Sequence, residues 1–175
     1  MKHLTAILLL LTACQPTADN LTLYTIAKGD HYCTPRQFAT TKGSIEYMVY
    51  VDASWLHIEN NAGWNKLIGI SDGLNHHRHS NRIVWRCIDG ESITFAHLVY
   101  QRGEWTASPF LTTYKPNRWV SVTVRNALTY YARVGQEFSM KERTGAGMQI
   151  VLYPYFGGID TAPHTMYFYF RSINN

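Results

Sequence analysis

Charged residues and cysteines are scarce in this chain of 175 residues. Asp, Glu, Lys and Arg make up 16% of it, and there are three cysteines. The formal net charge of +4 comes without a run of Lys or Arg, so we expect no nucleic-acid partner. No apolar run reaches the roughly 20 residues that a membrane-spanning helix needs. No window holds a long helical period, which argues against an α-helical domain.

The first residues have the layout of an export signal. Met1–His3 is short and basic, and Leu4–Leu11 is mostly apolar. The stretch that follows, Leu11-Thr12-Ala13-Cys14, resembles the lipobox of bacterial lipoproteins. The resemblance implies a signal peptide over 1–13, lipidation of Cys14 and a polar tether over 14–20. It further implies a cell-envelope protein, at the outer membrane or cell surface, that contacts the membrane through its lipid anchor alone.

Cys33 and Cys87 remain once Cys14 carries lipid. Disulfides persist in the compartments that exported proteins reach, so these two residues are a candidate disulfide. Two separate buried thiols are the alternative. The sequence leaves both open, because it does not place the Cα atoms that a disulfide must bring together.

Residues 21–175 have the length and pattern of one all-β domain. Apolar and polar residues alternate with period two in three stretches, and turn signals such as Asp72-Gly73 and Arg102-Gly103 separate further short apolar runs. We therefore predict an antiparallel β-sandwich of jelly-roll type. Its expected strands are 21–27, 44–52, 66–70, 82–87, 92–100, 119–125, 128–134, 137–141, 149–153 and 165–171.

One long segment sharpens this prediction. "KPNRWVSVTVRNALTYYARVGQEFSM", residues 115–140, runs from a turn through a Trp-led alternating strand and an aromatic strand to Val-Gly and a third strand. It resembles the hairpins of concanavalin A-like and laminin-G-like jelly rolls, and the similarity extends back to about Arg82. The resemblance implies a concanavalin A-like jelly roll, and it supports the fold more than the function.

The stretch "SDGLNHHRHSNR", residues 71–82, gathers three of the eight histidines. If it is extended, His77 and His79 share a face, and with Asp72 they form a candidate Zn site. Asp72-Gly73 and Asn75 also suit Ca²⁺, although two oxygens are too few to argue coordination. A solvated loop is a second interpretation. The third is direct ligand contact, in which His76, His77, His79 and Arg82 donate hydrogen bonds to sugar hydroxyls, sulfates or carboxylates.

Aromatic residues supply a second group of candidate ligand contacts. "YPYFGGIDTAPH", residues 153–164, is too rich in Pro, Gly and aromatics for an ordinary hairpin, and its rings could stack on sugars or plug the sandwich. The tryptophans at 85 and 119 are expected in the core, and those at 55, 64 and 105 near exposed turns. The aromatic and imidazole candidates for ligand contact are Trp64, Tyr155, Phe156 and His164.

The sequence lacks the carboxylate motif of a glycosidase but contains the residue types that a polysaccharide lyase uses. A glycosidase needs two carboxylates in register, and the Glu-x-Asp-x-Glu strand of the jelly-roll glucanases is absent. A polysaccharide lyase needs a Tyr or His base and an Arg that neutralises the uronate carboxylate. The candidates are His97, Tyr100, Tyr131 and Arg133, and "YYARVGQ" is faintly similar to a strand of alginate lyases, with Arg133 in place of its lysine.

Three functions follow in order of preference. The first is non-catalytic binding of an extracellular or envelope glycan by a surface or periplasmic lipoprotein. The one cofactor considered for it is a divalent metal, Ca²⁺ or Zn²⁺. The second is a small polysaccharide lyase. The third is a structural or adhesive module that binds a protein partner, which an unpaired edge strand or an exposed apolar patch would favour.

Overall fold

The computed structural model describes residues 20–57, 63–109 and 111–173. The predicted signal peptide, the lipidation site Cys14 and all of the tether except Asn20 lie outside this part of the chain. Within it, no helix is both long enough and apolar enough to cross a bilayer.

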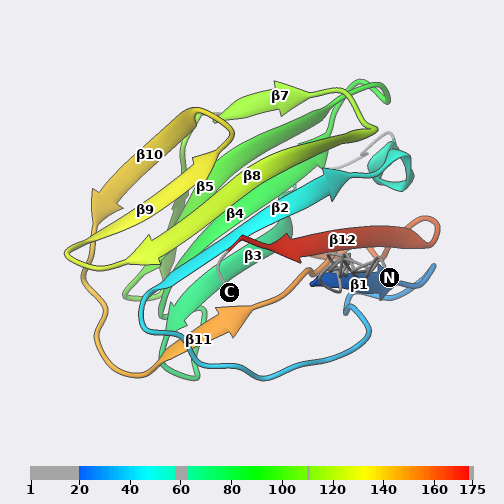
Figure 1. Ribbon diagram of the computed structural model, residues 1–175. Helices are drawn as coiled ribbons and strands as arrows, with labels where there is room; N and C mark the ends of the chain where they lie inside the picture. The colour runs from blue at the N-terminus through cyan, green and yellow to red at the C-terminus, as the bar shows by residue number, and fades with distance from the viewer. Residues whose placement is uncertain (1–19, 58–62, 110, 174–175) are drawn as a thin grey trace, which may run out of the picture.

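Two antiparallel six-stranded sheets face each other as a sandwich of jelly-roll type, so the predicted fold class is confirmed (Figure 1). One sheet has the order β1-β12-β2-β8-β9-β10 and is called the β2–β8 sheet below. The other has the order β11-β3-β4-β5-β6, with β7 paired to β5, and is called the β4–β5 sheet. The elements are β1 (Leu21–Ile26), β2 (Ser44–Val51), the 3₁₀ turn η1 (Ala53–Trp55), β3 (Asn65–Asp72), β4 (His79–Cys87), β5 (Ile93–Gln101), β6 (Glu104–Ala107), β7 (Thr112–Tyr114), β8 (Arg118–Asn126), β9 (Thr129–Val134), β10 (Glu137–Glu142), β11 (Gln149–Leu152) and β12 (Met166–Ser172).

All ten predicted strands are present, with ends shifted by a few residues. The two that sequence reasoning missed are β6 and β7, which are short and mostly unburied, so they lack a clear apolar alternation. The Arg102-Gly103 turn between β5 and β6 has φ of +56° and +97° at its two residues. Two positive φ values are the signature of a type I′ hairpin turn, whose twist matches that of the flanking strands.

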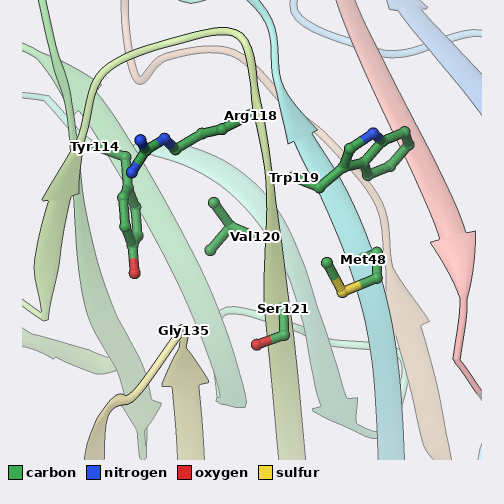
Figure 2. Close-up of a pocket in the computed structure, with 7 residues that line it drawn as sticks. All are labelled: Met48, Tyr114, Arg118, Trp119, Val120, Ser121 and Gly135. Carbon is green, nitrogen blue, oxygen red and sulfur yellow. The ribbon is translucent and has the colours of Figure 1, made fainter.

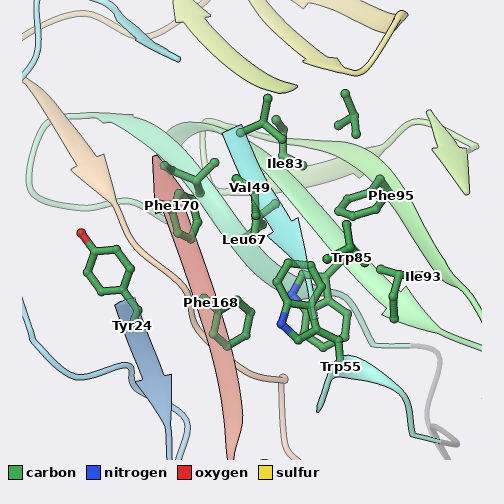
Figure 3. Packing of buried hydrophobic residues seen from close by; sticks show 14 of the residues in the cluster. Tyr24, Val49, Trp55, Leu67, Ile83, Trp85, Ile93, Phe95, Phe168 and Phe170 are labelled. Carbon is green, nitrogen blue, oxygen red and sulfur yellow. The ribbon is translucent and has the colours of Figure 1, made fainter. Parts of the chain in front are cut away.

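The core between the sheets is built around stacked aromatic rings (Figure 3). The indole of Trp55 lies 5.1 Å from that of Trp85 and 4.8 Å from the Phe168 ring, centroid to centroid. Its Nε1–H donates to the Tyr167 carbonyl at 2.7 Å, which satisfies the one polar atom of the buried ring. Trp85 is buried as predicted, but the predicted exposure of Trp55 is wrong, because η1 turns this indole into the sandwich.

The two cysteines are separate buried thiols, so the candidate disulfide is not formed. Cys33 lies in the connection that follows β1, whereas Cys87 ends β4 in the opposite sheet. Both side chains belong to the hydrophobic core. Burial raises the pKa of the Cys33 thiol to about 11, which keeps it in its unreactive protonated form.

A buried ion pair joins the end of β3 to the loop between β10 and β11. The Arg143 guanidinium donates to both carboxylate oxygens of Asp72, with Nη2 to Oδ1 at 3.0 Å and Nε to Oδ2 at 3.1 Å. Tyr130 Oη donates to Oδ2 at 2.8 Å, and Asn126 Nδ2 to Oδ1 at 3.2 Å. The Asp72 carboxylate is inaccessible to solvent and fully paired, as a buried charge must be.

We predict that Arg143→Ala lowers the free energy of unfolding by about 3–5 kcal/mol, because it leaves the buried Asp72 carboxylate without its cation. Chemical denaturation monitored by tryptophan fluorescence measures this change. Arg125→Ala is the matched control: its ion pair with Glu46 lies at the surface, where the Arg125 side chain is 52% exposed, so the loss should stay within about 1 kcal/mol. Equal losses in the two variants would contradict the role given to Asp72.

Candidate functional site

Cationic and aromatic side chains gather on the outer face of the β4–β5 sheet. On β4, Ile83 and Trp85 point into the sandwich, so Arg82, Val84 and Arg86 point outward. Antiparallel pairing places the outward side chains of neighbouring strands in rows. The rows are Ser71–Ser80–Tyr100–Trp105, Gly69–Arg82–Leu98–Ala107, Tyr155–Lys66–Val84–Ala96 and Arg86–Thr94–Thr113. This surface is called the β3–β5 face.

Arg82 crosses β3 at Gly69 and reaches the loop between β3 and β4. A Cβ at position 69 would lie 2.8 Å from Arg82 Cγ and 2.5 Å from the Asn81 carbonyl oxygen, so only glycine leaves room for this side chain. Arg82 Nε donates to Ser80 Oγ at 3.1 Å, and Nη2 donates to the His76 carbonyl at 3.1 Å. Ser80 Oγ donates to the same carbonyl at 2.7 Å, which fixes the loop.

The histidine-rich stretch is a turn rather than an extended segment. The His77 N–H donates to Asn75 Oδ1 at 3.1 Å, and the Arg78 N–H donates to the Asn75 carbonyl at 3.0 Å. Asparagine favours such local bonds over a strand. β4 begins at His79, so His77 and His79 do not share a strand face as the extended interpretation required.

Three of the predicted ligand-contact residues surround Tyr100. The Arg82 guanidinium carbon lies 5.4 Å from the centre of the Tyr100 ring, and the His77 ring meets it edge-on at 5.2 Å. The His76 ring lies 4.2 Å from that of His77. The structure therefore brings His76, His77 and Arg82 together with Tyr100, which was predicted as a lyase residue.

A second aromatic–cation group lies along β3. Lys66 and Tyr155 exchange backbone hydrogen bonds of 2.8 and 3.0 Å, so their side chains lie on the same face. Lys66 Nζ is 5.5 Å from the Tyr155 ring centre and donates to the Gly157 carbonyl at 2.7 Å. The Tyr32 ring packs edge-on against Tyr155 at 5.0 Å. Tyr155 is thus placed where a ligand on this face can meet it.

Trp64 completes the face at the end opposite to Tyr100. The Arg86 guanidinium carbon lies 4.3 Å from the centre of the Trp64 ring. Both Trp64 and Tyr100 pack on a small buried apolar cluster of Val84, Ala96 and Leu98, which lies outside the main core. This cluster holds the two rings on a rigid floor, as stacking on a ligand requires.

Burial and mutual repulsion tune the charges on this face. Burial, with a smaller contribution from Arg82, lowers the pKa of Lys66 to about 8. Burial, followed by the charges of Arg82, His77 and Lys66, lowers the pKa of His76 to about 4. Burial, followed by the charges of Arg82 and Lys66, also lowers the pKa of His77. Burial lowers the pKa of Arg82 to about 10, partly offset by Tyr100. At neutral pH the face therefore carries charged Lys66 and Arg82 beside two neutral imidazoles.

Acidic side chains are absent from the outward positions of β3, β4, β5 and β6 that form these rows. No carboxylate of these rows therefore neutralises the charges of Lys66 and Arg82. Cations over aromatic rings in a half-buried setting attract anions more strongly than fully solvated ones do. The arrangement suits a ligand with both apolar C–H surfaces and negative charge.

The predicted lyase set is not brought together. Because side chains alternate on β5, His97 points into the sandwich while Tyr100 points outward. Tyr131 and Arg133 lie on the outer face of the other sheet, where Arg133 Nη2 donates to Thr123 Oγ1 at 3.2 Å. The fully buried His97 bonds through Nε2 to Asn81 Oδ1 at 2.8 Å, and burial lowers its pKa to about 4. The four residues therefore lie in three separate places: His97 in the interior, Tyr100 on the outer face of the β4–β5 sheet, and Tyr131 with Arg133 on the outer face of the β2–β8 sheet.

The predicted metal set is not assembled either. Both Asp72 oxygens accept bonds from Arg143, and His79 Nδ1 lies 3.4 Å from Thr144 Oγ1 instead of facing His77. Across the described ranges, no three His, Cys, Asp or Glu side chains are placed to hold an ion.

Two further predicted ligand contacts have structural roles. Phe156 is 4% exposed and packs in the core against Trp85, so it is not available to stack on a sugar. His164 bonds through Nε2 to the Ser54 carbonyl at 2.6 Å, which fastens the loop before β12 to η1. Trp119, expected in the core, is 38% exposed, because the valines at alternating positions of β8 fill the inner side.

The sequence-based ligand contacts include neither Lys66 nor Arg86. A signal for Arg86 was present: in "RIVWR", residues 82–86, the two arginines alternate with the buried Ile83 and Trp85 and so share a face. Lys66 lies just before a β-bulge between Lys66 and Ile68, which shifts the alternation of β3 and hides its orientation.

No known protein family matches this chain, and no curated protein sequence matches it. A solved structure described as "The crystal structure of native glycosidic hydrolase" aligns with 89% of this chain and 77% of its own. The TM-score is 0.44 and the identity is 12%. Values this low do not allow that protein's activity to be transferred to this chain.

Proposed function

We propose that the β3–β5 face binds an acidic polysaccharide, whose sugars carry carboxylates, without cleaving it. The observation that carries the proposal is the joint placement of Lys66, Arg82 and Arg86 with Trp64 and Tyr100, over strands whose outward positions hold no carboxylate. Carbohydrate sites combine stacking surfaces with a few well-placed polar groups, and this face offers both.

The dimensions of the face suit a chain of sugars. Ser80 and Arg86 are six residues apart on β4, which is about 20 Å at roughly 3.3 Å per residue. Tyr100 lies in the row of Ser80 at one end, and Arg86 with Trp64 lies at the other. Lys66 and Tyr155 flank the middle. An extended oligosaccharide can therefore meet a ring at each end and cations between them.

The site needs little rearrangement to bind. The hydrogen bonds of Arg82 fix the loop that carries His76, and the floor of Val84, Ala96 and Leu98 fixes both terminal rings. Side chains that are already ordered lose less entropy on binding. Placement of the domain on the cell envelope, through a lipid on Cys14, is part of the same proposal and rests on the lipobox-like stretch Leu11–Cys14.

A polysaccharide lyase is the second candidate function. The observation that favours it is the contact of Tyr100 with both Arg82 and His77 on one face. Elimination needs a base beside a group that neutralises the uronate carboxylate. However, the Nε and Nη2 donors of Arg82 are already bonded to Ser80 and to the His76 carbonyl, which leaves this guanidinium less able to clamp a carboxylate.

Titration calorimetry with hexagalacturonate tests the proposed function. We expect saturable binding to the described domain, with no ultraviolet absorbance from unsaturated uronate after prolonged incubation. Trp64→Ala and Tyr100→Ala should each weaken the affinity at least fivefold, because each removes a stacking ring.

Tyr167→Ala is the matched control, since Tyr167 is 40% exposed but lies on the other sheet, and this change should leave the affinity within a factor of two. Formation of an unsaturated product would show that the chain is a lyase and would contradict binding without cleavage. Binding that resists both ring deletions, or no binding at all, would contradict the site.

The affinity should also depend on pH through Lys66. Its pKa of about 8 means that the ammonium is charged at pH 7 and loses its proton as the pH rises through 8, while the ligand carboxylates stay ionised. The affinity should therefore fall above about pH 8, by up to tenfold per pH unit.

In Lys66→Arg this fall should disappear between pH 7 and pH 9.5, because a guanidinium keeps its charge. Calorimetry at several pH values measures both proteins. A flat profile for the unmodified chain would show that Lys66 does not contact the ligand.

A further inference from the structure

A shallow groove lies on the opposite sheet, at the start of β8 (Figure 2). Its volume is about 470 Å³. Tyr114 and Arg118 lie on one side of the strand, and Trp119 and Met48 lie on the other, so the strand itself forms the floor. This volume is within the range of about 300–1,000 Å³ typical of small-molecule sites. None of its lining residues belongs to the β3–β5 face.

The floor of the groove presents main-chain polar groups. The Gly135 N–H donates to the Ser121 carbonyl at 2.8 Å, so position 121 points its backbone toward β9. Backbone direction alternates along a strand, and Trp119 therefore points its N–H and C=O to the same side. The β8–β9 pairing ends at Val122 and Val134, so within the described chain the backbone N–H and C=O of Trp119 have no partner on β9. They are a donor and an acceptor that face the groove.

The walls supply an aromatic surface and a positive charge. The indole of Trp119 is 38% exposed and packs beside Tyr50 at 5.4 Å. The guanidinium carbon of Arg171, on β12, lies 4.9 Å from the centre of the same indole, so a second cation adjoins this ring. Arg118 lies over the Tyr114 ring at 5.6 Å, and no described residue accepts a hydrogen bond from its exposed guanidinium. A guanidinium with unused donors is suited to a bidentate bond with a carboxylate. All seven lining residues are neutral or positive.

We propose that this groove is a second saccharide site, which takes a single uronate unit. The indole of Trp119 stacks on the pyranose, Arg118 binds its carboxylate, and the main-chain groups of Trp119 bond to its hydroxyls. A peptide strand is the less suitable occupant, since one N–H and one C=O cannot support a ladder. With the β3–β5 face on the opposite sheet, two sites make the domain bivalent, so that it can bridge two polysaccharide chains.

Fluorine NMR of protein labelled with 5-fluorotryptophan reads the two sites separately. The chain has five tryptophans. Trp64 and Trp105 report on the β3–β5 face, Trp119 reports on the groove, and the buried Trp55 and Trp85 are internal controls. With trigalacturonate we expect the Trp119 resonance to shift saturably. Its fully methyl-esterified form, which keeps the sugar rings and hydroxyls but lacks the charges, should give at most a fifth of that affinity.

Arg118→Gln should weaken the Trp119 titration at least fivefold and leave that of Trp64 unchanged. The proposal is overturned if Trp119 does not respond, if the methyl ester binds equally well, or if Arg118→Gln has no effect. A response from Trp64 without Trp119 would support the proposed function and reject the groove. A response from Trp119 alone would support the groove and reject the β3–β5 face.

Discussion

Side chains on a β-strand point alternately to its two sides, and in a two-layer sandwich this alternation decides which chemistry each surface holds. On β4 it sends Ile83 and Trp85 into the aromatic core and leaves Arg82 and Arg86 outside. On β5 it separates His97 from Tyr100. The composition of the β3–β5 face therefore depends on the same register that packs the core, and a slip of one residue would bury both arginines.

Arg82 contacts several groups of the β3–β5 face although it is almost fully buried. It is 5% exposed, and it fits only because Gly69 leaves space on the neighbouring strand. Its guanidinium donates to the His76 carbonyl and lies over the Tyr100 ring. After burial, which is the larger cause, its charge also lowers the pKa values of Lys66, His76 and His77. The result is a positive surface in which the imidazoles are neutral at physiological pH, so in the proposed function the lysine and the arginines recognise the anion.

The sandwich and ten of its twelve described strands were predictable, because alternation and turn chemistry are local signals. The site was predictable only in part. Unusual composition singled out His76, His77, Arg82, Trp64 and Tyr155, and the structure places all five on or beside the β3–β5 face. Phe156, His164 and Asp72 were misjudged because their partners are distant in sequence: Trp85, Ser54 and Arg143. Pairing across such separations leaves no trace in a single sequence.

If the β3–β5 face binds an acidic oligosaccharide without cleaving it, the ligand should lie intact along this face. A crystal structure of the domain in complex with hexagalacturonate tests this most directly. We expect unbroken ligand density between Trp64 and Tyr100, with carboxylates within hydrogen-bond distance of Lys66 Nζ or the Arg86 guanidinium. Density confined to another surface, or a cleaved ligand with an unsaturated end beside Tyr100, would contradict the proposed function.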